Sequence, residues 1–383
     1  MNKDAYSLQA FGRMMGDKVR MAAYEAAISR TVRHGDVVLD LGCGPGIMAM
    51  LACRAGARRV YAIDTNPVID FGRRLAETNG FADKIEFQQG DCRAIQLPER
   101  ADVIVSDIRG WLPLYAEAIT TLNDARTRFL AEGGRMIPSR DFLMCGVVTA
   151  FEQYQAITEP WRRDGLNLTA SLSVVLNSFY RAKENTSQLI SVPRRWGALD
   201  YTQNVDANAG GCVALPIVRD ATGHGLSLWF ETTLCEDIGY STGPGKVESN
   251  IYGQVFFPWE QPVRLFTGDE VQVELHADAS GGDYIWRWDT NIATRGKRKN
   301  ISFRQSTFYG GTFFPASLRK RATDFVPILS ESGQAECWLL QAMDGKRHLE
   351  DIAAEAVRQF PHVFRRVEDA FNRAAEIAEK YSR

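Results

Sequence analysis

A glycine-rich turn with acidic side chains around it is the part of this sequence best suited to chemistry. Residues 37–46 read Val-Val-Leu-Asp-Leu-Gly-Cys-Gly-Pro-Gly, and Asp64 closes the next apolar segment, 22 positions after Gly42. Glycines in such a turn let a ligand approach the backbone, and an acid at the following strand end can hold ribose hydroxyls. The pattern predicts a site for a nucleotide-like cofactor. The alternative is an ordinary turn between a strand and a helix that binds nothing.

The residues around the last glycine of the turn indicate which cofactor this is. A dinucleotide fingerprint, Gly-x-Gly-x-x-Gly, has its last glycine inside the helix. This chain has Ile47 there, and Gly46 follows Pro45. A rigid proline and a branched side chain fit poorly where a pyrophosphate must sit on the helix N-terminus. S-adenosylmethionine has no phosphate, so we predict this cofactor and disfavour a dehydrogenase.

The elements that would position these groups alternate through about residue 140. Apolar segments with the length of strands are separated by segments of helical character, which is the rhythm of βαβ units in an open parallel sheet. Ligands of such sheets bind at the carboxyl ends of the strands. Each acid at a strand end could alone be a helix cap or a solvated loop residue, but several together favour a site. Four stand at predicted strand ends: Asp40, Asp64, Asp91 and Asp107.

The rest of the chain changes its pattern twice. Segment 151–185 has apolar residues at helical spacing, and from 186 to about 305 short strands alternate with turns, which indicates an antiparallel barrel or sandwich. From about residue 312 the pattern is helical again. We therefore expect an α/β fold with three domains: a Rossmann-like domain over 1–140, a β-barrel domain with a helical arm over 141–305, and a small domain over 306–383.

Composition excludes several classes of function. The 383 residues carry a net charge of −2, which argues against nucleic-acid or membrane binding as the main role. No apolar run approaches the length of a transmembrane helix, and none follows the N-terminus as in a signal peptide. Seven scattered cysteines without a Cys-x-x-Cys motif fit a reducing cytoplasm. Five histidines without ligand-like spacing predict no metal site.

Several short motifs together resemble those of the protein arginine methyltransferases. Besides the glycine turn, they cover about residues 5–290 and include Asp17-Lys18-Val19-Arg20, Ser106-Asp107 with Gly110, Ile137-Pro138-Ser139-Arg140 and Gly239-Tyr240-Ser241-Thr242-Gly243-Pro244. The resemblance implies a class I methyltransferase domain, a barrel, and dimerisation through the arm 151–185. It also implies that Arg20 holds the cofactor carboxylate, Asp64 the ribose and Asp91-Cys92 the adenine edge. The full candidate set for the cofactor is Arg20, Asp40, Gly42, Gly44, Asp64, Thr65, Asp91, Cys92 and Ser106.

The acceptor side departs from that family. The family has two glutamates in its substrate loop, which can grip the fork of donors on a guanidinium. Here the first acid is Asp107, and the second position is Ala116, with Glu117 one residue later. Arg109 lies between them, and a cation there should neutralise Asp107 and repel a guanidinium. The family's Thr-His-Trp loop is replaced by residues 249–252, which contain no histidine. Asp107 and Glu117 are the candidate catalytic residues.

Residues 312–383 resemble a PqqD-like winged-helix module of the kind that recognises leader peptides. Such modules add the leader as an extra strand. Residues 325–329 and a turn at Ser332-Gly333 would supply the sheet edge. A plain winged helix for dimerisation or DNA binding is the alternative.

The sequence thus predicts an S-adenosylmethionine-dependent N-methyltransferase, acting as a homodimer on an amine of a ribosomally made peptide in secondary metabolism. Asp107, with Glu117, would orient the amine or take its proton. Free arginine or another small amine is the alternative acceptor. A catalytically inactive protein that binds the cofactor and regulates a partner is the alternative of another class.

Overall fold

The computed structural model describes residues 7–162, 165–246, 251–293, 300–311, 319–320 and 322–382. Residues 5–312 form one compact unit, and residues 313–383 belong to a second. The predicted histidine-free loop at 249–252 lies partly outside the described residues, which resume at Ile251.

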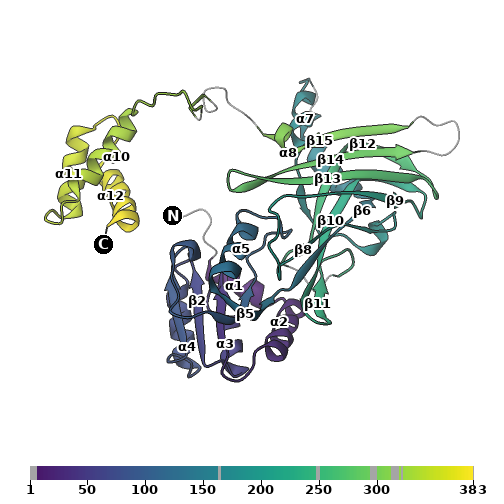
Figure 1. The fold of residues 1–383 in the computed structure, drawn as a ribbon. Coiled ribbons are helices and arrows are strands. Elements are labelled where there is room, and N and C mark those ends of the chain that lie inside the picture. The colour runs from purple at the N-terminus through teal and green to yellow at the C-terminus, as the bar shows by residue number, and fades with distance from the viewer. Residues whose placement is uncertain are drawn as a thin grey trace. The chain divides into compact units, whose positions relative to one another are not determined.

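A five-stranded parallel sheet forms the first half of the larger unit (Figure 1). Every residue of β1 is buried, as expected for a strand with helices over both faces of its sheet. The strand order reverses between β1 and β4, and such a switch point places the loops after these strands beside one another. In the order β3-β2-β1-β4-β5, the strands are β1 (Val37–Leu41), β2 (Arg59–Asp64), β3 (Ile85–Gln89), β4 (Ala101–Ser106) and β5 (Leu130–Ile137).

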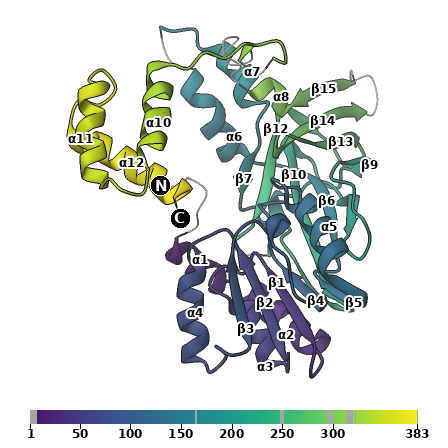
Figure 2. The ribbon, with the colours of Figure 1, turned by 60° about the vertical axis from the view of Figure 1, so that its left-hand side comes forward.

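Helices pack on this sheet, and local sequence sets where they begin. Asp17 caps α2 by accepting the backbone N–H of Arg20 at 3.1 Å. Helix α3 begins directly after Gly46, whose φ of 77° belongs to the left-handed region that glycine tolerates. Figure 2 shows α4 beside the parallel strands. The elements are α1 (Leu8–Met15), α2 (Lys18–Thr31), α3 (Ile47–Arg54), α4 (Ile69–Thr78), the turn η1 (Cys92–Ala94) and α5 (Ala118–Phe129).

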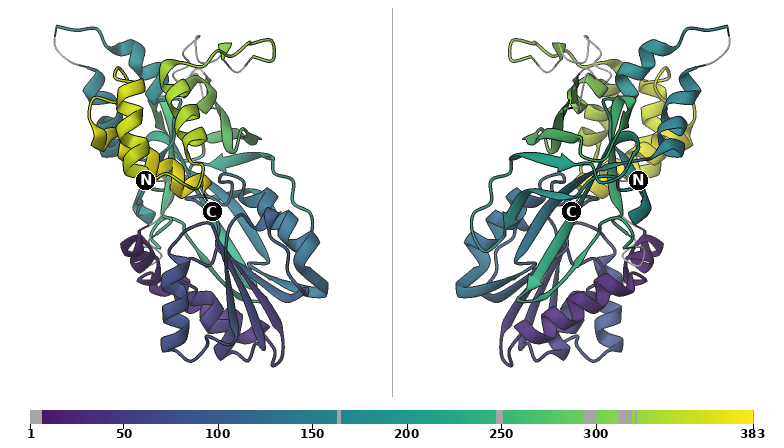
Figure 3. Two further views of the ribbon diagram at one scale, coloured as in Figure 1. Left: turned by 90° about the vertical axis from the view of Figure 1, so that its left-hand side faces the viewer. Right: turned by 90° about the vertical axis from the view of Figure 1, so that its right-hand side faces the viewer.

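The second half of the larger unit is antiparallel (Figure 3). One sheet has the order β7-β12-β10-β6-β8, with β11 paired to β10, and the other has the order β15-β14-β13-β9. Large aromatic side chains fill the core, such as Phe257 and Trp288, whose ring centroids are 5.0 Å apart. The strands are β6 (Arg140–Val148), β7 (Tyr180–Ala182), β8 (Arg194–Asp200), β9 (Ala209–Pro216), β10 (Ala221–Cys235), β11 (Ile238–Ser241), β12 (Gln254–Leu265), β13 (Glu270–Ser280), β14 (Asp283–Ala293) and β15 (Ile301–Ser306). The predicted α/β fold, with a Rossmann-like sheet and a barrel-like antiparallel region, is confirmed.

The segment predicted as a helical arm is only partly helical and partly internal. Leu176 is buried against Tyr154 and Phe256, and Phe179 stacks on Phe257 with ring centroids 5.3 Å apart. The apolar spacing of this segment therefore does not mark an exposed face at Leu176 and Phe179, because the barrel itself covers them. Short elements make up this region and the ends of the barrel: α6 (Phe151–Thr158), η2 (Glu159–Trp161), η3 (Thr169–Ser171), α7 (Leu172–Val175), β7, η4 (Thr186–Gln188) and α8 (Thr307–Gly310).

The second unit contains three helices around a small apolar core: α10 (Glu331–Ala342), α11 (Leu349–Gln359) and α12 (Val367–Tyr381). The Ser330 hydroxyl accepts the backbone N–H of Gly333 at 3.2 Å and caps α10. The predicted turn at Ser332-Gly333 is therefore wrong, since a serine cap starts a helix there. Residues 319–320 and 322–382 contain no strand, so the winged-helix prediction is not confirmed. In either unit, no described helix has the length and apolar character needed to cross a membrane.

One buried carboxylate in the antiparallel half has no charged partner among the residues that the structure describes. Glu184 is 4% exposed, and neither of its side-chain oxygens makes a hydrogen bond with the described residues. Burial raises the pKa of Glu184 to about 7. Ser227 opposes this pKa shift, although its hydroxyl makes no hydrogen bond with the described residues. Glu184 is therefore a group whose ionisation costs stability.

Glu184→Gln should stabilise the protein in a pH-dependent way. A pKa raised from 4.5 to about 7 means that the folded state keeps a proton that the unfolded state releases. The native protein should therefore lose stability relative to the variant as the pH rises through this window. At 1.36 kcal/mol per pKa unit, the advantage of the variant should reach about 3 kcal/mol. Urea unfolding at mildly acidic and mildly alkaline pH, with exposed Glu132→Gln as control, tests this; an advantage independent of pH would contradict it.

Candidate functional site

The glycine loop after β1 is a place where the backbone tolerates no side chain. Gly42 and Gly44 have φ angles of 73° and 50°. A Cβ on Gly42 would lie 2.2 Å from the Ile108 side chain, and a Cβ on Gly44 would lie 2.4 Å from the Phe11 ring. Helix α1 and the loop after β4 therefore both close directly onto the glycine loop, and the switch point accounts for the second of these contacts.

Asp64 ends β2 and turns back onto this loop. Its Oδ2 accepts the backbone N–H of Gly44 at 2.6 Å, and its Oδ1 accepts that of Asn66 at 2.7 Å. Burial raises the pKa of Asp64, and these backbone donors lower it. A carboxylate offers about four lone-pair sites, so its oxygens keep capacity for a ligand diol. Thr65, the next candidate, is exposed beside it.

Two of the predicted cofactor residues hold the fold around the loop. Asp40 is buried, and its Oδ2 accepts the backbone N–H of Ala49 at 2.8 Å, which fixes the first turn of α3. Burial raises the pKa of Asp40 to about 7, and the Ala49 N–H lowers it. The Ser106 hydroxyl donates to the Leu41 carbonyl at 2.9 Å and joins β4 to β1. The structure thus gives Asp40 and Ser106 positioning roles.

The predicted residues at the adenine edge share an arginine with Glu117. Arg93 pairs with Asp91 at 2.7 Å and with Glu117 at 2.9 Å. The side chain of Cys92 is buried, and its carbonyl accepts Nη2 of Arg128 at 2.7 Å. Glu117 therefore lies on the Asp91 side of the site, and the structure does not bring it together with Asp107.

Asp107 belongs to a buried cluster of charges. Its Oδ2 lies 2.5 Å from Nη2 of Arg20, and its Oδ1 accepts the Tyr24 hydroxyl at 3.0 Å and lies 3.3 Å from Nε of Arg109. Its side chain is 9% exposed. Arg20 also donates from Nη1 to the Met14 carbonyl at 3.1 Å. If Arg20 holds the cofactor carboxylate as predicted, its guanidinium must bind that carboxylate and Asp107 at the same time.

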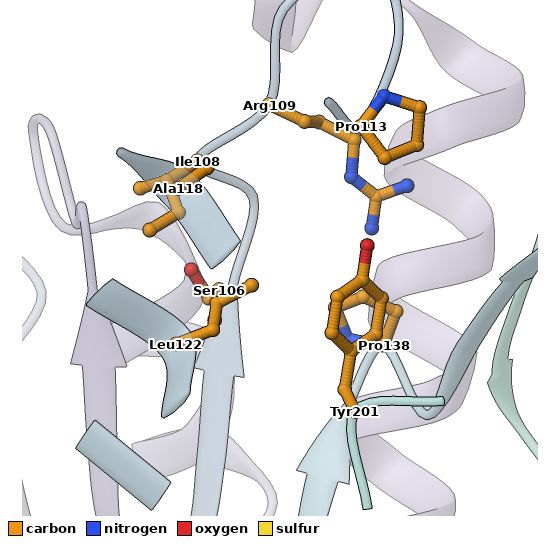
Figure 4. Close-up of a pocket in the computed structure, with 8 residues that line it drawn as sticks. All are labelled: Ser106, Ile108, Arg109, Pro113, Ala118, Leu122, Pro138 and Tyr201. Atoms are coloured by element: carbon orange, nitrogen blue, oxygen red, sulfur yellow. The ribbon is translucent and has the colours of Figure 1, made fainter. Parts of the chain in front are cut away.

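Arg109 is enclosed rather than facing an open channel. Its Nη1 contacts Oδ1 of Asp141 at 3.2 Å, and its guanidinium carbon lies 5.1 Å from the centroid of the Phe230 ring. Burial lowers the pKa of Arg109, but Asp141 and neighbouring groups raise it well above its ordinary value. Figure 4 shows the guanidinium pointing toward the Tyr201 hydroxyl, which donates to Asp141 at 2.7 Å. The cavity there, about 10 Å³, has room for one water.

Sequence reasoning found Asp107 and Arg109 but missed their partners. Asp141 is the first residue of β6 to be fully buried, and Tyr201 follows β8. The sequence signal for Asp141 was a single acid among the apolar residues that follow Ser139-Arg140. Burial raises the pKa of Asp141, and Arg109 lowers it, so the pair exists only because each partner offsets the burial of the other.

The groups present suit a nucleoside-like methyl donor. Glycines without side chains, the Asp64 carboxylate at the end of β2 and the Arg20 guanidinium are the kinds of donor and acceptor that such a ligand needs. Asp64 would hold the ribose, the segment at Asp91-Cys92 would border the adenine, and Arg20 would face the carboxylate. No cluster of three or more metal-ligating side chains occurs among the described residues.

Comparisons of sequence point to the same class. Residues 21–168 match the family described as ribosomal protein L11 methyltransferase (PrmA). The chain is 29% identical over 298 residues to protein arginine N-methyltransferase PRMT10 of Oryza sativa subsp. japonica, a match that covers 68% of this chain and 78% of the relative. It is 39% identical over 130 residues to protein arginine N-methyltransferase 1 of Schizosaccharomyces pombe, covering 33% of this chain and 38% of the relative.

Solved structures share the fold. Protein arginine methyltransferase 10 of Arabidopsis thaliana superposes with a TM-score of 0.70 at 22% identity, over 78% of this chain and 97% of that chain. The Trypanosoma brucei PRMT1 enzyme–prozyme heterotetrameric complex with AdoHcy gives 0.69 at 23% identity, over 77% and 97%. The chain is therefore a methyltransferase that resembles the arginine methyltransferases in sequence and shares their fold. Its cofactor is S-adenosylmethionine, as predicted.

Asp64→Ala should weaken binding of S-adenosylmethionine and its demethylated product. The substitution removes the predicted acceptor for the ribose, and an unmade hydrogen bond in a buried site costs about 1–3 kcal/mol. Titration calorimetry measures this, with exposed Asp70→Ala on α4 as control. Unchanged affinity in Asp64→Ala, or tight binding of NAD by the native chain, would contradict the assignment.

Proposed function

We propose that the chain transfers a methyl group from S-adenosylmethionine to an amine of a peptide, and not to a protein arginine. The position of Arg109 carries this proposal, because its buried guanidinium lies between Asp107 and Asp141. A substrate guanidinium would have to enter beside a cation that already holds both carboxylates. Like charges within about 4–6 Å are strongly unfavourable in a partly dry site.

The role of Asp107 follows from its neighbours. Two guanidinium groups and the Tyr24 hydroxyl contact it, so its two oxygens are held in place by fixed donors. It would accept an N–H of the amine and orient the lone pair, since alignment supplies much of the gain in such a transfer. Bound S-adenosylmethionine would supply an electrophilic methyl group. An α-amine, with a pKa of about 8, is neutralised far more cheaply than a guanidinium.

A peptide as the carrier of the amine is supported by the smaller unit. Val326, Ile328 and Leu329 precede α10 and are 79%, 89% and 58% exposed. Neighbouring exposed apolar side chains of this kind suit contact with another chain. A ribosomally made peptide in secondary metabolism is the acceptor we favour, and free arginine or another small amine is the alternative.

A regulatory function is favoured by a separate observation. The ion pair between Arg20 and Asp107 means that a cofactor carboxylate competes with Asp107 for one guanidinium. A chain with this arrangement can bind the cofactor without turnover and support an active partner. The Trypanosoma brucei PRMT1 complex, which shares this fold, is an enzyme–prozyme heterotetramer.

Labelled methyl transfer followed by mass spectrometry separates these functions. We expect label on amine-bearing peptides or free amines and none on glycine-arginine-rich or histone-like proteins. Asp107→Asn should abolish turnover because it removes the charge and keeps the shape, and circular dichroism should confirm that it folds. Methylation of arginine in a generic protein would overturn the acceptor class. Full turnover by Asp107→Asn would remove this residue from the catalytic set, and no label on any acceptor would favour the regulatory function.

We also propose that the chain forms a homodimer through segment 151–185. Phe151 and Leu166 are 58% and 62% exposed, and such side chains gain by burial in a partner. Phe151→Glu with Leu166→Glu should give a monomer in light scattering, whereas Gln155→Glu on the same helix should not. A native chain that is monomeric at micromolar concentration would refute the proposal.

A further inference from the structure

Arg109 lies in surroundings that have the chemistry of a binding site for a guanidinium ion. Carboxylates approach its fork from two elements: Asp107 from the loop after β4 contacts Nε at 3.3 Å, and Asp141 from β6 contacts Nη1 at 3.2 Å. Phe230 of β10 places its ring 5.1 Å from the guanidinium carbon. Paired carboxylates and an aromatic face are the groups that bind a planar, delocalised cation.

We infer that Asp107, Asp141 and Phe230 form a guanidinium-binding site that the chain fills with its own Arg109. Arg109 is thereby the residue that excludes a guanidino acceptor. The second part of this inference rests on the proposed function, whereas the existence of the site does not. The Arg109 side chain is 4% exposed, so it occupies the site in full.

The balance of charge explains why no second guanidinium enters. Arg20 and Arg109 face Asp107 and Asp141, so two positive charges meet two negative charges in a buried cluster. A further cation would be uncompensated, and burying such a charge is very costly. Removal of Arg109 would leave two buried carboxylates with one cation, and a space of the shape and charge that a guanidinium ion fills.

One nitrogen of the Arg109 guanidinium marks a position where an added guanidinium ion could make a further hydrogen bond. Nη2 of Arg109 is buried and makes no hydrogen bond with any described residue. The cavity of about 10 Å³ lined by Arg109, Tyr201 and Pro138 lies beside this residue. A free guanidinium, which no side chain tethers, would have that space next to its third nitrogen while Asp107 and Asp141 bind the other two.

Thermal unfolding of Arg109→Ala with millimolar guanidinium chloride tests the site. We expect the variant to melt below the native chain. Guanidinium should raise its melting temperature above that in equal sodium chloride, and it should leave the native chain unchanged. Arg109→Ala combined with Asp141→Asn should lose this response, because the amide keeps the shape and removes one charge. A response in the native chain equal to that of the variant, or none in the variant, would overturn the inference.

If Arg109→Ala is recovered unfolded, the same question is answered by refolding it from urea. Millimolar guanidinium should increase the refolded fraction relative to sodium at equal ionic strength, and an equal fraction in both would overturn the inference. These readouts involve no methyl transfer. If guanidinium restores the folding of Arg109→Ala but no methylated product is found, only the proposed function is contradicted. If an amine is methylated but guanidinium does not restore folding, only the guanidinium-binding site is contradicted.

Discussion

The buried pairing of two arginines with two aspartates is the constraint on which the site depends. A charge taken out of water without a partner is costly, whereas a pair or a closed network offsets much of that cost. The four charges come from different parts of the larger unit: Arg20 from α2, Asp107 and Arg109 from the loop after β4, and Asp141 from β6. Their pairing therefore ties the parallel sheet, its N-terminal helix and the antiparallel sheet together, and fixes the loop that faces the glycine turn.

This constraint affects the cofactor end and the acceptor end of the site differently. The cofactor end keeps bare glycines and the Asp64 carboxylate, which binds backbone N–H groups yet retains acceptor capacity. At the acceptor end, Asp107 is the acid that would face a substrate, and Arg20 and Arg109 of the same chain already pair with it. Glu117 pairs with Arg93 instead of approaching Asp107. The geometry therefore favours a methyltransferase whose acceptor does not need two free carboxylates.

The parallel sheet and its glycine loop could be read from the sequence, because strand periodicity and turn glycines are local signals and the switch point follows from strand order. The apolar spacing in 151–185 was also visible. It could not show that Leu176 and Phe179 pack on the chain's own barrel, because helical spacing does not say which surface covers a face. Asp141 as the partner of Arg109 was not predictable either, since that pairing joins positions 32 residues apart and depends on the register of two sheets. In the second unit, the Ser330 hydroxyl caps the start of a helix where the sequence predicted a turn.

The most direct test of the central claim is a double-mutant cycle on the stability of Arg109→Met and Asp141→Leu. If the two charges are buried and paired, each single substitution leaves the other charge uncompensated and should cost about 3–5 kcal/mol. The double substitution should cost far less than the sum, because it removes both charges and keeps apolar volume. Losses that add within about 0.5 kcal/mol would mean that the two residues do not interact, and would contradict the account.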